Sequence, residues 1–386
     1  MDFSLTADQQ QLQELARSFA RNEMRDAARD MEATNEPLSR EYLRRYGEMG
    51  FLGVNMDPAL GGHGLSDLDA LLVLEEFAKV HPAVAFPIFE SSVGPIRAIE
   101  RFAEASLARR LVPRVCRGEL TVAVAMSEPD AGTALTDLRT HARRRDGEIV
   151  LNGRKRWCSG GGHAEGYLVY CRLSDEPGAK GIGAVYVEKE SPGLSFGRRE
   201  QLMGFRGIHT AEIVLDNVRV PADHLVAAAG SFGRLMEAFD LERCGNATMC
   251  LGLAASALED VLAYVEERRQ FGRPIAEFQA VQLKLAEMAM QVEASRLLIH
   301  KAVVAKQADF PSVLGSSIAK CFANEMSRDV CGKALQLMGG YGYAKDFPAE
   351  QRFRDAWGWG IAGGTIDIQK VNIASALLGR RFAQRA

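Results

Sequence analysis

Residues 119–133 read ELTVAVAMSEPDAGT, and this stretch decides the fold because the pattern of apolar residues changes there. After it come short runs rich in Val, Ile and Tyr, separated by Gly, Pro and Asp: GEIVLNG at 147–153, GYLVYCRL at 166–173, IGAVYVEK at 182–189 and AEIVLDNVRV at 211–220. Such runs are typical of β-strands. Because no helical segment separates them, they favour an antiparallel barrel or sandwich over a doubly wound nucleotide-binding fold.

The chain on both sides of this region has the period of helices. Residues 6–24 predict an amphipathic helix that begins behind Thr6 and Gln9, a capping-box pair. The same period recurs at 67–80, 95–115, 251–271, 280–305 and 313–338. We therefore expect an α+β protein with a helical N-terminal domain over 1–119, a central β domain over 120–228 and a helical C-terminal domain over 229–386.

Composition excludes several classes of function. The chain has 386 residues, 47% of them hydrophobic, and a net charge of -3 with no basic cluster, which argues against nucleic acid or anionic lipid as a partner. Its seven cysteines form no CxxC pair, so we expect no metal site and cysteines that pack as small core residues. The start, MDFSLTADQQQL, lacks the pattern of a signal peptide, and we find no membrane span, so we expect a cytoplasmic protein.

One short motif points in a different direction. Residues 358–363, GWGIAG, match the GxGxxG fingerprint of dinucleotide-binding folds. That fingerprint requires a strand before it, whereas this copy follows the charged segment EQRFRDA in a helical region. We therefore do not expect a Rossmann site.

Six segments resemble the acyl-CoA dehydrogenase family, and the resemblance extends over essentially the whole chain. They are AMSEPDAGT at 125–133, NGRKRWCSGG at 152–161, MGFRGIHTAEIVLDNVRVP at 203–221, ERRQFGRPIAEFQAVQ at 267–282, QLMGGYGYAKDFPAEQRFRDA at 336–356 and GGTIDIQK at 363–370. The resemblance implies FAD as cofactor, a C-terminal four-helix bundle, and a homotetramer built as two dimers with FAD at the subunit contacts. It also implies an acyl thioester as substrate and electron-transfer flavoprotein as electron acceptor.

The resemblance also implies which residues bind FAD. The backbone near Met126 and Ser127 would face the polar edge of the flavin, Gly132 and Thr133 would approach the pyrophosphate, and Thr133 would also border the substrate. Trp157 would lie against the flavin, with the Ser159 hydroxyl near N5. Across the dimer contact, Arg268, Gln270, Phe271 and Gln279 would serve the flavin of the neighbouring subunit, while Gln336, Gly339, Gly340, Thr365 and Asp367 would contact its adenosine half.

The chain departs from the family pattern at several of these positions. Thr133 replaces the usual Ser, Ala134 the usual Asp, and Asp367 a usual Gln, so individual contacts are expected to differ. The larger departure is Gly363, because many family members carry the catalytic carboxylate at that position. Either dehydrogenation is lost, or another residue is the base.

Glu242 is the candidate for a base elsewhere in the chain. In AFDLERCGNA, Glu242 occupies the site from which isovaleryl-CoA and long-chain acyl-CoA dehydrogenases supply their glutamate, and those relatives also lack the C-terminal one. An isolated glutamate at the start of a helix would by default be a solvated carboxylate favoured by the helix dipole. Because position 363 is a glycine and carries no carboxylate, we predict that Glu242 is the base and that an apolar site raises its pKa. Asp240 and Arg243 would bind the phosphopantetheine or adenosine end of the substrate.

Other functions remain open. The same scaffold can carry a flavin N-hydroxylase or monooxygenase, or a desulfinase that needs no proton abstraction, and the acyl group can be bound to coenzyme A or to a carrier protein. A helical interaction scaffold with relic cofactor motifs is the alternative outside enzymology. Because Gly363 leaves room beside the reacting carbons, we expect a branched or cyclic acyl group to be preferred over a straight chain.

Overall fold

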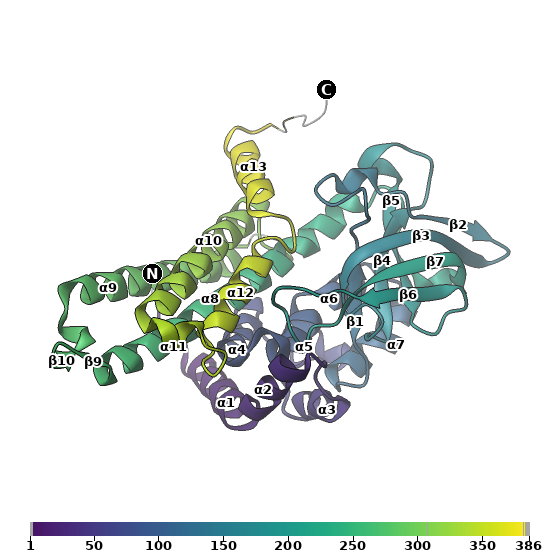
Figure 1. Cartoon of the computed structure of the whole chain (residues 1–386). Coiled ribbons are helices and arrows are strands. Elements are labelled where there is room, and N and C mark those ends of the chain that lie inside the picture. The colour runs from purple at the N-terminus through teal and green to yellow at the C-terminus, as the bar shows by residue number, and fades with distance from the viewer. Residues whose placement is uncertain (1–2, 307, 381, 383–386) are drawn as a thin grey trace.

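The computed structural model describes residues 3–306, 308–380 and 382. Its elements follow the order helical, β, helical (Figure 1). The N-terminal helices are α1 Ala7–Glu23, α2 Arg25–Thr34, α3 Arg40–Glu48, α4 Asp67–Val80, α5 Pro82–Ser92, α6 Pro95–Phe102 and α7 Ala105–Cys116. The predicted capping box is present at the start of α1, where Thr6 and Gln9 bond each other's backbone. The run predicted as a single helix over 95–115 is divided into α6 and α7, because the backbone at Ala103 is extended (ψ 160°).

The central domain is one sheet built from β1 Val122–Ala125, β2 His141–Arg145, β3 Glu148–Ser159, β4 Gly166–Arg172, β5 Ile182–Glu188, β6 Leu194–Arg199, β7 Thr210–Pro221 and β8 Leu225–Ala227. Its order is β6-β7-β3-β2-β4-β5-β8, with β1 beside β4. The expectation of an antiparallel domain holds for most of the sheet and is corrected at two pairings, since β1 runs parallel to β4 and β2 meets β4 in a single parallel pair. β2 and β6 were not predicted, because HARRR and LSFGRR lack an apolar alternation.

Both faces of this sheet are covered. In β4, Tyr167, Val169 and Cys171 belong to the core of the β domain. Leu168 and Tyr170, which alternate with them, belong to a second core that is shared with both helical domains. This alternation follows from the two-residue period of a strand, and it places the helical domains directly against the sheet.

The C-terminal domain consists of α8 Phe232–Glu267, a hairpin of β9 Arg269–Gln270 and β10 Arg273–Pro274, α9 Gln279–Val304, α10 Val313–Met338, α11 Gly340–Tyr343, α12 Ala349–Trp359 and α13 Ile366–Leu377. Helices α8, α9 and α10 pack against one another, and α12 and α13 pack on α10. Helix α8 also contacts α4 and α5 of the N-terminal domain. It is the central element through which the two helical domains share one core.

The length and apolar composition of α8 would also suit a membrane span, a match that the sequence analysis did not anticipate. However, 67% of its most apolar window is buried inside the protein. Burial of that kind is typical of a core helix.

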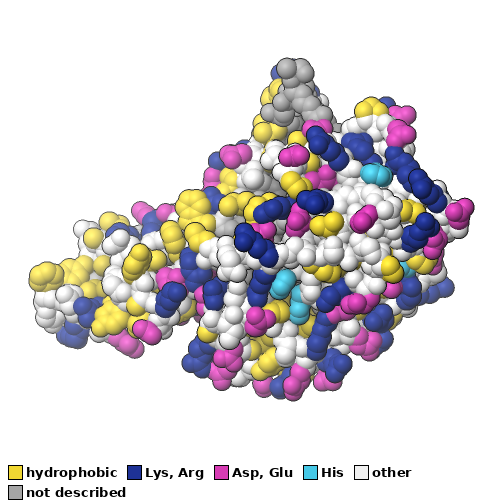
Figure 2. Space-filling model, turned by 45° about the vertical axis from the view of Figure 1, so that its right-hand side comes forward, with side chains coloured by type: hydrophobic (Ala, Val, Ile, Leu, Met, Phe, Trp, Pro, Cys, Tyr) yellow, Lys and Arg dark blue, Asp and Glu magenta, His cyan; other side chains and the backbone are white. Residues whose placement is uncertain are grey.

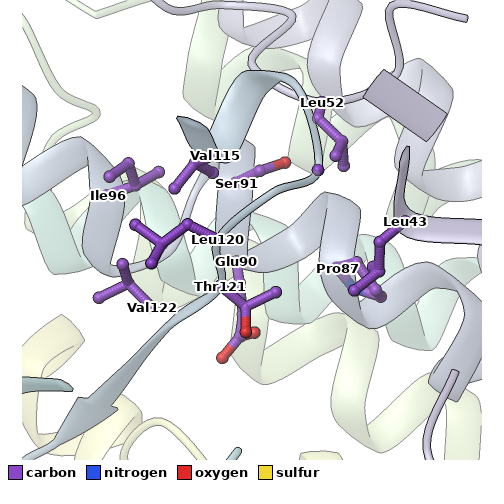
Figure 3. A pocket seen from close by; sticks show the side chains of 11 residues that line it. Leu43, Leu52, Pro87, Glu90, Ser91, Ile96, Val115, Leu120, Thr121 and Val122 are labelled. Atoms are coloured by element: carbon purple, nitrogen blue, oxygen red, sulfur yellow. The ribbon is translucent and has the colours of Figure 1, made fainter. Parts of the chain in front are cut away.

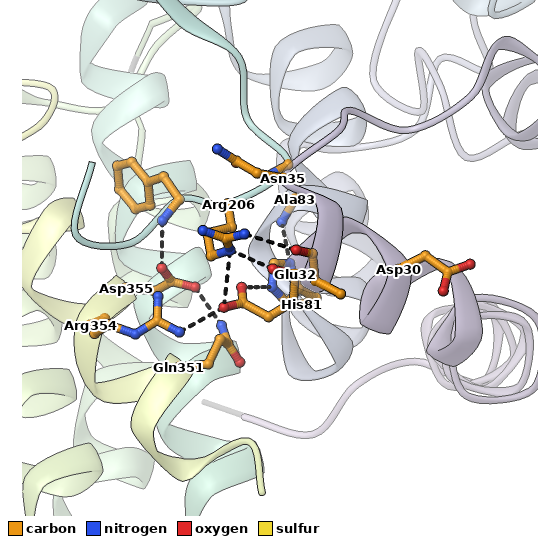
Figure 4. Close-up of polar contacts among 12 residues, drawn as sticks. Asp30, Glu32, Asn35, His81, Ala83, Arg206, Gln351, Arg354 and Asp355 are labelled. Atoms are coloured by element: carbon orange, nitrogen blue, oxygen red, sulfur yellow. Dashed lines mark hydrogen bonds and ion pairs between the residues drawn. The ribbon is translucent and has the colours of Figure 1, made fainter. Parts of the chain in front are cut away.

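A polar cluster joins the three domains (Figure 4). Glu32 of α2 accepts hydrogen bonds from Arg354 of α12 at 2.7 Å and lies 3.3 Å from His81 Nε2, and its backbone carbonyl accepts one from Arg206 of the β domain. Asp355, also in α12, accepts a bond from the backbone N–H of Phe205 at 2.7 Å. Burial raises the pKa of Glu32, but the bonds from His81 and Arg354 outweigh it and lower the pKa overall. The cluster therefore contains a charged carboxylate that ties α2 to α12.

Candidate active site

The predicted flavin loop follows β1 directly. Met126 is buried, Ser127 is half-buried, and Gly132 and Thr133 are exposed. The backbone carbonyl of Ser127 accepts a bond from the Arg156 N–H at 2.9 Å, which joins this loop to β3. The structure thus brings the loop next to Trp157 and Ser159, as the prediction requires.

A buried ion pair that the sequence analysis missed fixes this loop. Glu128 accepts bonds from Lys155 Nζ at 2.9 Å and from the backbone of Arg139 and Thr140 at 2.6 and 2.9 Å. Lys155 Nζ also donates to the Met126 carbonyl at 2.9 Å. Burial raises the pKa of Glu128, but Lys155 and the backbone bonds outweigh it and lower the pKa overall. The alternation of strand β3 could have revealed Lys155, since it points inward between Arg154 and Arg156.

Trp157 has an unusual backbone. It lies in an irregular part of the β3–β7 pairing and has φ of +60°, a left-handed conformation that a bulky residue rarely adopts. The residue is 55% exposed, and the Arg156 guanidinium lies 4.6 Å from the centroid of its ring. A Trp in a β domain is normally a core residue. Here the bulge holds a flat aromatic ring outward, as contact with a flat ligand requires.

Glu242 lies within the interior of α8, which corrects the expectation of a helix-start residue. It stands ten residues after Phe232, the first residue of the helix, and it is half-buried rather than solvated. Burial raises its pKa to about 8, and Arg243 and Lys320 only partly oppose that effect. Among the described residues, no hydrogen bond to its carboxylate is found. Glu242 therefore combines an unpaired carboxyl group with a pKa close to neutral.

The loop that carries Gly363 faces the same side of α8. A Cβ placed on Gly363 would lie 3.7 Å from Asn246 Nδ2, 3.7 Å from Lys320 Cε and 3.8 Å from Phe239 Cζ. Phe239, Glu242 and Asn246 follow the i, i+3, i+7 spacing of one helical face. Gly363 thus lies against the face of α8 that carries Glu242, although 121 positions separate the two residues in the sequence.

Lys320 is the second residue that sequence reasoning missed. Its ammonium group is buried and donates to Gly364 O at 2.9 Å, to Asn324 Oδ1 at 3.0 Å and to Trp359 O at 3.4 Å. Burial lowers its pKa to about 7. It holds the 359–364 loop in place, and its positive charge, like that of Arg243, opposes the raised pKa of Glu242.

Asp240 and Arg243 are bound to each other. Both are buried, they form an ion pair, and Ser316 Oγ donates to Asp240 at 2.6 Å. Burial raises the pKa of Asp240, which Arg243 and Ser316 oppose. The predicted contact of these two side chains with the substrate would therefore have to compete with this pair.

The residues predicted to act across a subunit contact lie away from the β domain. Gln270 and Phe271 are exposed at the β9–β10 hairpin, at the tip of the arm formed by α8 and α9 (Figure 1), and Gln279 is exposed at the first residue of α9. Phe271 is 94% exposed with φ of +51°, and Gly272 follows with φ of +82°, the backbone of a two-residue hairpin turn. Arg268 lies 5.7 Å from the ring of Tyr341, just beyond the end of α10. The hairpin cannot serve a cofactor held by Trp157 of its own chain.

The five residues predicted at the adenosine half do not form one site in a single chain. Gln336, Gly339 and Gly340 are exposed at the end of α10, whereas Thr365 and Asp367 begin α13, which packs near Lys320. At 1.5 Å per residue, Lys320 and Gln336 are about 24 Å apart along α10. These two groups can meet one ligand only if a second subunit contributes one of them.

The exposed surfaces fit a flavin dinucleotide. A Cβ on Gly132, Gly339 or Gly340 would meet no atom within 4 Å, so the backbone there is open to close approach by a phosphate or a sugar. On the β domain, Trp157 offers an exposed aromatic ring in the strand that is hydrogen-bonded to the loop carrying Gly132. Among the described residues, no group of three or more His, Cys, Asp or Glu is placed to hold a metal ion. All seven cysteines are free and buried, as expected.

Comparisons with known proteins identify the family of the chain. The family models for the N-terminal, middle and C-terminal domains of acyl-CoA dehydrogenase match residues 6–119, 123–218 and 232–378. A 3-sulfinopropanoyl-CoA desulfinase from Paraburkholderia xenovorans (strain LB400) is 38% identical, and the alignment covers 99% of each chain. An acryloyl-CoA reductase (NADH) from Anaerotignum propionicum is 36% identical, covering 98% of this chain and 97% of that protein.

Among solved structures, butyryl-CoA dehydrogenase from Megasphaera elsdenii has a TM-score of 0.94 at 32% identity, covering 98% of this chain and 100% of the other. Together with the domain matches, this likeness confirms the predicted fold class of a helical N-terminal domain, a β middle domain and a helical C-terminal domain.

Proposed function

Since the chain belongs to the acyl-CoA dehydrogenase family, we propose that it oxidises the bond between the α- and β-carbons of an acyl thioester, with Glu242 as the base that removes the α-proton. It is an oxidoreductase that acts on acyl-CoA, and its cofactor is FAD.

One observation supports the assignment of the base. Glu242 is an unpaired, half-buried carboxyl group on the face of α8 that also carries Phe239 and Asn246, the two α8 residues nearest to Gly363. A general base is most effective when its pKa lies near the working pH, and burial gives Glu242 a pKa of about 8.

The chemistry divides between the cofactor and the chain. Bound FAD supplies the acceptor for the hydride that leaves the β-carbon. Trp157 would orient the flavin, the Ser159 hydroxyl would bond to it, and the Glu128–Lys155 pair keeps the 126–133 loop in place beside them. A carboxylate oxygen of Glu242 would take the α-proton, while Lys320 holds the opposite wall through the Gly364 carbonyl.

Glu242→Gln tests the base. The amide has nearly the same shape and cannot accept the proton, so we expect normal FAD content and a ~10²–10⁴-fold lower rate of flavin reduction by the cognate thioester. Glu237→Gln, an exposed glutamate on the same helix, is the matched control and should keep the wild-type rate. An unchanged rate in Glu242→Gln would show that another group is the base.

A desulfinase is the second candidate, because the 38% identical relative from Paraburkholderia xenovorans is a 3-sulfinopropanoyl-CoA desulfinase. That reaction removes the sulfur group instead of oxidising the acyl chain. Sulfite release from 3-sulfinopropanoyl-CoA without lasting reduction of the flavin would favour it. Anaerobic bleaching of the flavin by saturated acyl thioesters would favour dehydrogenation.

We also propose a homotetramer built as two dimers and electron-transfer flavoprotein as the oxidant. Support for the assembly comes from α9, where Leu283, Met290, Leu297 and Val304 recur every seven residues and are 59%, 70%, 41% and 65% exposed. Figure 2 displays hydrophobic side chains gathered along the arm that contains α9 and the hairpin. Such a stripe is typical of a helix that packs against another subunit.

A further inference from the structure

Glu90, near the end of α5, is a carboxylate that the proposed reaction does not use. It is half-buried, and no hydrogen bond or ion pair joins its carboxylate to any residue that the structure describes. Buried carboxylates are normally paired, because an unpaired charge in a poorly solvated place is costly. Burial and repulsion by Glu242 raise the pKa of Glu90 well above its usual value.

Glu90 lines two adjoining hollows between the helical and β domains. One is lined almost entirely by apolar side chains, and Figure 3 places the Glu90 carboxylate beside Thr121, at the side away from Leu52. The other has about 420 Å³ of empty space, partly open to solvent, and is lined by Pro87, Glu90 and the turn at Gly160.

Of the described residues that line the two hollows, none is a lysine or an arginine. His163 and His209 also line the larger one, but burial lowers the pKa of His163 to about 4 and also lowers that of His209, so both rings are neutral at pH 7. Arg40, the nearby arginine that repels His163, forms an ion pair with Glu165. Among the residues that the structure describes, none pairs with the Glu90 carboxyl group, so a cation that entered these hollows would meet a carboxyl group without a partner.

Glu90 also borders the proposed reaction site. A Cβ on Gly160 would lie 3.7 Å from Glu90 Oε1, and Gly160 directly follows Ser159, the residue predicted to bond the flavin. Glu90 is close enough to Glu242 for the two carboxyl groups to repel each other. Glu90 on α5 thus lies beside the turn that follows β3 and within the electrostatic field of Glu242 on α8.

We propose that Glu90 is a specificity-determining residue that binds a protonated nitrogen in the acyl group of the substrate. The inference rests on the proposed function, because it assumes that the acyl group lies between Glu242 and the Ser159–Gly160 turn. A cation there would pair with a carboxylate that otherwise has no partner and would reduce its repulsion with Glu242. The substrate class is therefore a basic acyl thioester, with an amine in the chain or in a ring.

The test compares two thioesters of nearly equal shape, piperidine-4-carbonyl-CoA and cyclohexanecarbonyl-CoA, on the FAD-loaded enzyme. A hydrogen bond to a charged group contributes about 1.5–3 kcal/mol, which corresponds to roughly 10–100-fold in affinity. We expect the piperidine thioester to bind more tightly by that factor, measured from the change in the flavin absorption spectrum on titration, and to reduce the flavin with a higher kcat/KM. Glu90→Gln should reduce the ratio to near one, while Glu41→Gln, an exposed glutamate on α3, should leave it unchanged.

Each outcome decides between the two proposals. Tighter binding of the cyclohexane thioester by the wild type, or a ratio that Glu90→Gln leaves unchanged, would overturn the role of Glu90. The wild-type ratio tests the inference even if Glu90→Gln does not fold. If other acyl thioesters bleach the flavin while the piperidine compound neither binds nor reacts, the proposed function stands and this inference fails. If the piperidine compound binds with the expected preference but no thioester bleaches the flavin, dehydrogenation fails and the binding role of Glu90 stands.

Discussion

The pKa of Glu242 sets an expected pH dependence for turnover. Only the deprotonated carboxylate can take a proton, and burial raises its pKa to about 8. We therefore expect kcat/KM for flavin reduction to rise with pH and to level off above about pH 8. Stopped-flow measurements from pH 6 to 9.5 check this, with a thioester whose own groups do not titrate in that range. A profile without a step near pH 8 would contradict the assignment.

The raised pKa of Glu242 also predicts that the stability of the folded protein falls as the pH rises, whereas turnover increases. The pKa of Glu242 is higher in the folded protein than the usual 4.5, so the folded state holds the proton more tightly between about pH 4.5 and 8. Stability is then lost as the pH rises through this window, by at most about 1.4 kcal/mol per pH unit. Glu242→Gln lacks this proton, so its free energy of unfolding should exceed that of the wild type increasingly toward pH 8.

Gly363 is expected to select the shape of the acyl group. A methyl group at this position would meet its neighbours at ordinary contact distance, 3.7–3.8 Å, but φ is +65°, which costs an L-residue roughly 1–2 kcal/mol. Gly363→Ala should lower kcat/KM for isobutyryl- and cyclohexanecarbonyl-CoA more than for butyryl-CoA, by roughly 10-fold. Gly379→Ala is the control. Gly379 has φ of +63° and open space around it, so this variant measures the cost of the left-handed backbone without any new side-chain contact. Equal losses for branched and straight chains would show that Gly363 does not border the substrate.

At the scale of elements, the junction of β1 and β3 holds the flavin loop through one buried ion pair. Glu128→Gln would leave the Lys155 ammonium buried without its counter-charge, a change that costs roughly 3–5 kcal/mol. We expect a lower melting temperature and weaker retention of FAD, measured by thermal unfolding and by the flavin content after dialysis. The double variant Glu128→Gln/Lys155→Met removes both charges and should recover much of the stability but not the FAD affinity. Recovery of both would show that the pair only stabilises the fold.

The whole molecule is expected to complete its cofactor site only as an oligomer. Met290→Lys places a charge in the exposed stripe of α9 and should convert the tetramer into smaller species, as measured by light scattering after size-exclusion chromatography. Leu65→Lys, at a 46% exposed site in the N-terminal domain, should leave the assembly intact. Phe271→Ala should keep the tetramer and weaken FAD binding. A monomeric wild type that retains FAD would contradict the placement of the hairpin at a neighbouring subunit.

The sequence by itself determined the order of the domains and the absence of a carboxylate at position 363, which is a glycine. Apolar periodicity is a local property, so the helix behind Thr6 and the strand at 166–172 could be predicted from their own residues. The sequence could not determine that β1 pairs parallel with β4, because pairing depends on contacts between distant segments.

Tertiary structure alone decided how the site is charged. Glu90 and Lys320 show no motif in the sequence, and each becomes significant only because packing of α5 and α10 around α8 brings it into the electrostatic field of Glu242. The raised pKa of Glu242 has the same origin, since burial by neighbouring elements, and not the identity of the residue, destabilises its charged form. The type of a residue and its spacing from other residues can be read from the sequence, whereas its solvation depends on which residues the fold packs around it.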